Sequence, residues 1–173
     1  MKNLLLSGSP RCGKTTVIME VVKHLSKSNC GGFYTGEIKE SGRRTGFSIN
    51  TLDGGKGTLS HVNIKGPPRV GRYGVNLADL ERIAVPAVLE AVRNRRLVII
   101  DEIGKMELFS EKFREAVLLS LDSPVPVLGT IMESNNPFAD AVKRRQDVTL
   151  IQVTTENRGS LPDRLVSIIT QER

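Results

Sequence analysis

The chain has 173 residues, of which 39% are hydrophobic and 25% are charged, which is the size and composition of one globular domain spanning residues 1–173. No apolar run approaches the roughly 20 residues that a membrane span requires, and the N-terminus is too briefly apolar for a secretory signal. Its 25 basic and 19 acidic residues give a formal charge of +6, and its two cysteines, too few for a disulfide framework, favour the cytoplasm.

The first elements predict a strand, a helix and a second strand. Residues 4–6 form a short apolar run of the kind found in buried parallel strands. Residues 31–38 predict another strand. Between them, residues 14–25 place apolar side chains on one side at helical spacing: Val17, Val21, Val22 and Leu25.

The pattern then changes. A Ser-Gly pair at 41–42 and Asp-Gly-Gly at 53–55 are hairpin turn signals that separate short alternating segments. We therefore predict an antiparallel β insertion around residues 36–75, which interrupts the alternation of strands and helices.

The second half of the chain returns to that alternation. Asn76 and Ser110 are predicted helix caps, and Pro86 must kink or restart the first of these helices. The remaining predicted elements are strands at 97–100, 125–131 and 148–153, a helix around 137–144 and a last helix after Ser160. The whole order predicts an α/β fold whose mainly parallel sheet is flanked by helices.

Residues 8–15 match the complete pattern G-x-x-x-x-G-K-[ST], the Walker A motif or P-loop. Glycines let the backbone wrap around phosphate so that successive N–H groups point inward, and the following helix adds the positive end of its dipole. Lys14 then reaches the β- and γ-phosphates, and Thr15 is a Mg²⁺ ligand. The predicted nucleotide-binding residues are Gly8, Ser9, Pro10, Arg11, Cys12, Gly13, Lys14, Thr15 and Thr16.

Two carboxylates end the most apolar strand, where open α/β sheets bind ligands. We expect Asp101 to face the Mg²⁺ held by Thr15, and Glu102 to orient and deprotonate an attacking water. The predicted Walker B segment is therefore Leu97, Val98, Ile99, Ile100, Asp101, Glu102, Ile103 and Gly104.

These motifs resemble the cancer-related nucleoside-triphosphatase family, a group of small P-loop NTPases. The most specific match is DEIGKMELFS at residues 101–110. Further similar stretches are GFYT at 32–35 with Glu37, RRTGF at 43–47, VGRYGV at 70–75 and TENR at 155–158.

The resemblance covers the whole chain and implies a RecA-like P-loop core. It also implies slow, Mg²⁺-dependent hydrolysis of ATP, GTP, CTP and UTP to diphosphate and phosphate, with nucleotide contacts in the two segments above. The chain departs from the family in two places. Residues 10–12 are Pro-Arg-Cys where the family more often has Pro-Gly-Val, and Gly36 replaces a common acidic residue.

Several polar residues are weaker candidates. Thr130 ends a predicted strand, where its hydroxyl could sense the γ-phosphate or bond to the local backbone. Asn157 and Arg158 follow the last strand, where their loop could contact the base. Three arginines are candidates for cancelling transition-state charge, because guanidinium presents fixed donors to phosphate: Arg43, Arg44 and Arg72.

Two alternatives to hydrolysis stay open. A small-molecule or nucleoside kinase could use the same P-loop, with residues 36–75 as acceptor pocket or lid. A nucleotide-dependent RNA-associated switch would fit the positive charge. The scattered basic residues and an aromatic content of 4% do not favour nucleic acid as a partner, and no pattern predicts a protein partner.

Overall fold

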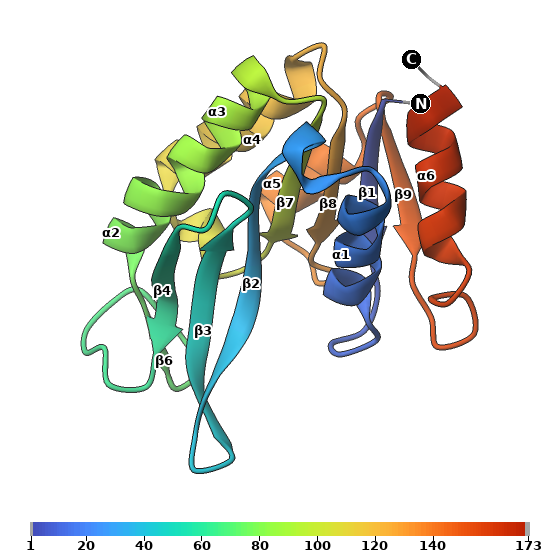
Figure 1. Cartoon of the computed structure of the whole chain (residues 1–173). Helices are drawn as coiled ribbons and strands as arrows, with labels where there is room; N and C mark the ends of the chain where they lie inside the picture. The colour runs from blue at the N-terminus through green and yellow to red at the C-terminus, as the bar shows by residue number, and fades with distance from the viewer. Residues whose placement is uncertain (1, 172–173) are drawn as a thin grey trace.

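The computed structural model describes residues 2–171 and contains a nine-stranded sheet with helices on both faces (Figure 1). The strand order is β5-β6-β4-β3-β2-β7-β8-β1-β9. Five neighbouring strands, from β2 to β9, pair in parallel, and the other pairs are antiparallel. The predicted α/β architecture, a parallel core flanked by helices with an antiparallel insertion, is confirmed, and because the insertion extends the same sheet, the sheet as a whole is mixed.

The parallel half has the strand that leads to the phosphate loop near its middle. Its members are β2 (Cys30–Glu40), β7 (Leu97–Ile103), β8 (Val127–Ile131), β1 (Asn3–Ser7) and β9 (Val148–Gln152). Successive side chains of β1 enter different cores: Leu5 packs on one face of the sheet, and Leu4 and Leu6 pack on the other. Burial on both faces explains why these strands are continuous apolar runs.

Two layers of helices cover the sheet. On one face lie α1 (Lys14–His24) and α6 (Leu161–Gln171), which share one core cluster. On the other lie α3 (Val85–Asn94), α4 (Glu111–Asp122) and α5 (Pro137–Lys143). Short helical segments complete the chain: η1 (Lys27–Asn29), α2 (Leu77–Asp79), η2 (Leu80–Ala84) and η3 (Glu107–Phe109).

We call residues 36–75 the β-wing. It extends the same sheet, because the start of β2 pairs in parallel with β7 while the rest of β2 pairs antiparallel with β3 (Arg43–Thr51). The wing continues through β4 (Lys56–His61), β6 (Tyr73–Val75) and β5 (Arg69–Val70). The last two strands are too short to show a period of two, so the sequence did not predict them.

Local signals set the helix boundaries as expected. The side chains of Asn76 and Ser110 accept hydrogen bonds from the N–H groups of Asp79 and Phe113, respectively. Pro86 stands in the first turn of α3, so it restarts the helix instead of kinking it.

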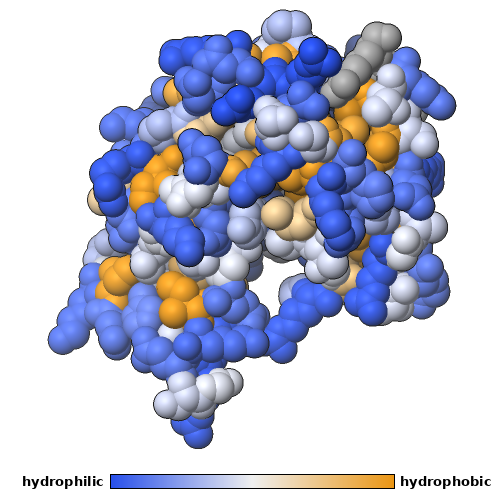
Figure 2. Space-filling model, viewed as in Figure 1, coloured by the Kyte–Doolittle hydropathy of each residue, from blue (hydrophilic) through white to orange (hydrophobic). Residues whose placement is uncertain are grey.

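Within residues 2–171, no helix combines the length and apolarity needed to cross a bilayer. In the view of Figure 2 the surface is mainly hydrophilic, with scattered apolar patches.

Candidate functional site

The phosphate loop connects β1 to α1 at the C-terminal edge of the sheet. Gly8 and Gly13 have φ angles of +153° and +107°, which side chains with a β-carbon rarely adopt. A β-carbon on Gly8 would also lie 2.6 Å from the carbonyl oxygen of Val153. Glycine is therefore required at this turn, and α1 begins immediately after it, at Lys14, so that its first amides and its dipole face the loop.

Lys14 folds back over the loop. Its Nζ donates hydrogen bonds to the carbonyl oxygens of Gly8 at 2.6 Å and Ser9 at 3.1 Å. This keeps an ammonium group above the amides that would cradle phosphate. The other loop side chains divide by exposure: Ser9, Pro10, Arg11 and Thr16 are exposed, whereas Cys12 is buried in the core beside α1.

Asp101 is the centre of a short hydrogen-bonded group at the end of β7. Thr15 Oγ1 donates to its Oδ2 at 2.6 Å, and Thr130 Oγ1 donates to its Oδ1 at 2.6 Å. The carboxylate is only 2% exposed. Burial raises the pKa of Asp101, while the two threonine hydroxyls and the charge of Lys14 act to lower it. The structure thus brings together Lys14, Thr15 and Asp101 from separate parts of the sequence.

This group fits Mg²⁺ bound together with a nucleotide. A hydroxyl and a carboxylate, Thr15 and Asp101, are hard oxygen donors of the kind that Mg²⁺ prefers. In the described part of the chain, no three His, Cys, Asp or Glu side chains gather in a way that would hold a metal ion by themselves. Mg²⁺ commonly completes its octahedron with water and phosphate oxygens, so two protein ligands beside a phosphate loop suffice.

Glu102 follows Asp101 and has a second carboxyl group, Glu107, close to it. If Gly104 had a β-carbon, that atom would lie 2.4 Å from Glu102 Oε1 and 2.9 Å from Glu107 Oε2. Gly104 therefore makes room for two carboxyl groups. Burial, and secondly the charge of Asp101, raises the pKa of Glu102.

Glu107 is a residue of this site that the sequence did not predict. It is only 4% exposed, and burial, together with the charge of Glu102, raises its pKa well above the ordinary value. The backbone N–H groups of Glu107 itself and of Gly104 donate to its carboxyl group. Burying an ionised carboxyl group costs folding free energy, which the raised pKa and these two hydrogen bonds reduce. In the sequence, only the position of Glu107 six residues after Asp101, within the family motif at residues 101–110, points to a role in this site.

The remaining candidates occupy different surroundings. Thr130 uses its hydroxyl on Asp101. The amide of Asn157 organises its own turn, accepting from the N–H of Thr154 and donating to the carbonyl of Gln152. Arg158 lies over the phosphate loop, with its Cδ 3.2 Å from the position that a β-carbon on Gly13 would occupy. Of the three candidate arginines, Arg44 and Arg72 meet at Tyr73, whereas Arg43 is exposed and makes neither contact, which makes it a poorer candidate.

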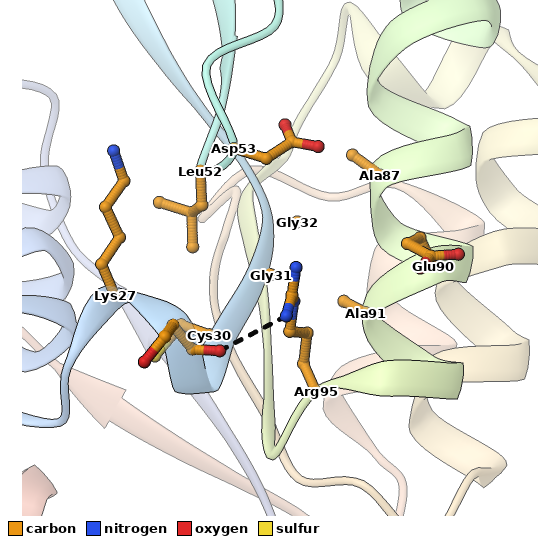
Figure 3. A pocket seen from close by; sticks show the side chains of 11 residues that line it. Lys27, Cys30, Gly31, Gly32, Leu52, Asp53, Ala87, Glu90, Ala91 and Arg95 are labelled. Atoms are coloured by element: carbon orange, nitrogen blue, oxygen red, sulfur yellow. Dashed lines mark hydrogen bonds between the residues drawn. The ribbon is translucent and has the colours of Figure 1, made fainter.

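A separate hollow of about 280 Å³ lies where β2 begins (Figure 3). It is lined by residues 27, 28 and 30–32, by Leu52 and Asp53, by one side of α3, and by Arg95, which follows that helix. Gly31 and Gly32 pair there with Val98 and Ile99, near the start of β7, whereas Asp101 stands at its end. The hollow thus lies nearer the start of β7 than Asp101 does, and none of its lining residues belongs to the phosphate loop.

Known proteins resemble this chain throughout. A family model described as NTPase matches residues 3–166. The nucleoside-triphosphatase THEP1 of Thermotoga sp. (strain RQ2) is 45% identical over 170 residues, covering 98% of this chain and 97% of that protein. The crystal structure of THEP1 from the hyperthermophile Aquifex aeolicus superposes with a TM-score of 0.87 at 38% identity, covering 96% of this chain and 98% of that one. The solution structure of a human cancer-related nucleoside triphosphatase gives 0.86 at 39% identity, covering 100% of both chains.

Proposed function

The chain belongs to this nucleoside-triphosphatase family, and from that premise we propose that it hydrolyses several nucleoside triphosphates to diphosphate and phosphate with Mg²⁺, slowly and with weak base discrimination. The observation that carries the proposal is the convergence of Lys14, Thr15 and Asp101 at one edge of the sheet. Phosphoryl transfer depends on positioning and charge neutralisation, and these groups supply both. With Mg²⁺ bound between Thr15, Asp101 and the phosphates, the ion would add further neutralisation of charge.

In the proposed reaction, the oxygen of a water molecule bonds to the γ-phosphorus. The bond between this phosphorus and the β,γ-bridging oxygen breaks, and the bridging oxygen leaves on the diphosphate with the electron pair. Glu102 orients the water and accepts its proton, for which its raised pKa makes it a better base than an ordinary surface carboxylate. Lys14 binds the β- and γ-phosphate oxygens on which negative charge is concentrated.

We propose weak base discrimination because the phosphate loop would contact the phosphates, which are the same whichever base is bound. Arg158 is our candidate for a base contact, since its side chain packs over Gly13 at the rim of the loop. The amide of Asn157 is already engaged within its turn, which makes it a poorer candidate. We further propose that the chain acts as one domain, because β2 belongs to both the parallel half and the β-wing, and that it acts in the cytoplasm, because two cysteines do not suggest an exported disulfide-stabilised domain.

The direct experiment measures phosphate release from ATP, GTP, CTP and UTP with Mg²⁺, with and without nucleosides as acceptors. We expect free phosphate without an acceptor, at roughly 10⁻² s⁻¹ or below, as in slow GTPases. Diphosphate that forms only when an acceptor is present would support the kinase alternative. Use of a single base would contradict the proposed weak discrimination.

A further inference from the structure

One cationic and aromatic cluster in the β-wing surrounds Arg44. Its guanidinium carbon lies 5.0 Å from the ring centroid of Phe47 and 5.8 Å from that of Tyr73, and these two rings pack edge to face. Its Nε donates to the Tyr73 hydroxyl at 3.0 Å, and its Nη1 donates to Glu37 Oε1 at 3.0 Å. Arg44 is therefore oriented by two rings and two hydrogen bonds, which removes much of the freedom of a long side chain before any ligand binds.

Arg72 supports this arrangement through its own contacts with Tyr73. Its guanidinium carbon lies 5.2 Å from the centroid of that ring, and its Nη2 donates to the Tyr73 hydroxyl at 3.2 Å and to the backbone carbonyl of Arg44. Two guanidinium donors on one phenol oxygen lower the pKa of Tyr73. Arg72 thus fixes the ring on which Arg44 rests, whereas the adjacent Arg43 is exposed and takes part in none of these contacts.

Glu37 joins the cluster to the phosphate loop. Its carboxylate lies 3.0 Å from Arg44 Nη1, 3.2 Å from Lys39 Nζ and 3.9 Å from Arg11 Nε, and Arg11 belongs to the loop itself. In Figure 2, hydrophilic side chains reach across the gap between the β-wing and the rest of the molecule. Three cations thus meet at one carboxylate, and the β-wing faces the phosphate loop with an excess of positive charge.

We infer that Arg44 is the catalytic arginine of this protein, which leaves Glu37 when a triphosphate binds and donates to the γ-phosphate oxygens during hydrolysis. The inference deepens the proposed function and rests on it. A terminal phosphate beside Arg11 has more charge and more acceptor oxygens than the single carboxylate of Glu37, so it competes effectively for the guanidinium. Phe47 and Tyr73 continue to guide Arg44 as it changes partners.

Exchange of Arg44 between a carboxylate and a phosphate also agrees with slow turnover. GTPases with an arginine in the same chain turn over at roughly 10⁻² s⁻¹, about 30-fold faster than those that lack one. We expect Arg44 to give an advantage of at least that order, and its release from Glu37 to be one reason why the proposed turnover is slow.

The test compares Arg44→Ala and Arg44→Lys with Arg43→Ala, the matched control one residue away. We expect the Arg44 variants to lower kcat by about 30-fold or more and to weaken binding of the Mg²⁺-triphosphate by a much smaller factor, because Arg44 exchanges one anionic partner for another on binding and acts mainly in the transition state. Arg43→Ala should match the wild type in both quantities. Thermal unfolding of all three variants shows whether they are folded, and Arg44→Lys keeps the positive charge in the cluster.

Chemical rescue separates a catalytic role from a structural one. Adding millimolar guanidinium chloride to Arg44→Ala should restore part of the lost rate and leave Arg43→Ala unaffected. A folded Arg44→Lys that hydrolyses triphosphate at the wild-type rate overturns the inference, and so does an Arg44→Ala that loses activity through weaker nucleotide binding alone. Wild-type protein that releases no phosphate contradicts the proposed function instead, so the two failures are distinguishable.

Discussion

The hydroxyl of Thr130, at the end of β8, donates a 2.6 Å hydrogen bond to Oδ1 of Asp101, at the end of β7. Because Thr15 holds the other oxygen of the same carboxylate, Asp101 is fixed from both sides. β8 lies between β1 and β7, so Thr130 stands between the phosphate loop and the Walker B strand. The hydroxyl of Thr130, a candidate for sensing the γ-phosphate, is thus used to orient Asp101.

Thr130→Val should destabilise the protein without changing the volume of the side chain at this position. Valine keeps the shape of threonine but leaves a buried carboxylate with one donor fewer, which costs about 1–3 kcal/mol. Urea unfolding measures the loss. Thr170→Val, on the exposed face of α6, is the matched control and should change stability by less than about 0.5 kcal/mol. Equal stability of the two variants would mean that the Thr130 hydroxyl contributes nothing to holding Asp101.

Lys14→Ala should abolish most hydrolysis and leave the fold intact. In the proposed reaction the charge of Lys14 meets the β- and γ-phosphates, and its hydrogen bonds to the loop carbonyls are made by a partly exposed ammonium group. We expect turnover to fall by at least about 10²-fold, since charge neutralisation dominates phosphoryl transfer. Lys23→Ala, on the exposed side of the same helix, is the control. Wild-type phosphate release by Lys14→Ala would rule out the phosphate loop as the catalytic site.

Glu107→Gln should make stability less sensitive to pH. The folded state raises the pKa of Glu107, so the folded protein retains a proton that the unfolded chain has already lost. The stability that this proton contributes is complete below the ordinary carboxyl pKa and is lost as the pH rises through the folded pKa. Glutamine does not titrate, so the free energy of unfolding of the variant should rise relative to that of the wild type by up to about 1.4 kcal/mol per pH unit across this range.

Urea unfolding of wild type and Glu107→Gln from pH 4 to pH 8 checks this pH dependence. The same substitution at the exposed Glu115 shows what the loss of a surface carboxylate does. Parallel stability profiles for wild type and Glu107→Gln would contradict a buried, protonated Glu107. Turnover of the same variant tells whether Glu107 also holds Glu102, because a positioning role predicts a lower kcat with unchanged nucleotide binding.

The features predicted correctly from the sequence are those that short-range rules determine. The phosphate loop needs glycine at two fixed positions and a strand and helix on either side, all within 25 residues. Asp101 could be placed opposite Thr15 because parallel strands expose their C-terminal ends at one edge. Asn76 and Ser110 accept hydrogen bonds from N–H groups three residues away, so their roles as caps can be predicted from the local sequence.

Other features depend on distant neighbours and could not be predicted. Arg43 and Arg44 are chemically identical and adjacent, and only the folded β-wing brings Tyr73 to one of them. Glu107 lies between Met106 and Leu108, and no pattern in the sequence shows that the packing around Gly104 buries it beside Glu102. β5 and β6 have two and three residues, so their pairing is decided by tertiary contacts and not by a pattern.

The most direct test of hydrolysis by an activated water is single-turnover phosphate release by Glu102→Gln, measured beside nucleotide affinity by calorimetry. Glutamine keeps the size of the side chain but cannot accept the proton, so phosphate release should fall by roughly 10²-fold or more. Lys14, Thr15 and Asp101 are unchanged, so the affinity for Mg²⁺-triphosphate should be as high as in the wild type. Asp101→Asn is the contrasting variant and should weaken Mg²⁺-dependent binding as well. Normal phosphate release by Glu102→Gln would contradict the account, because the water would then be activated by another group.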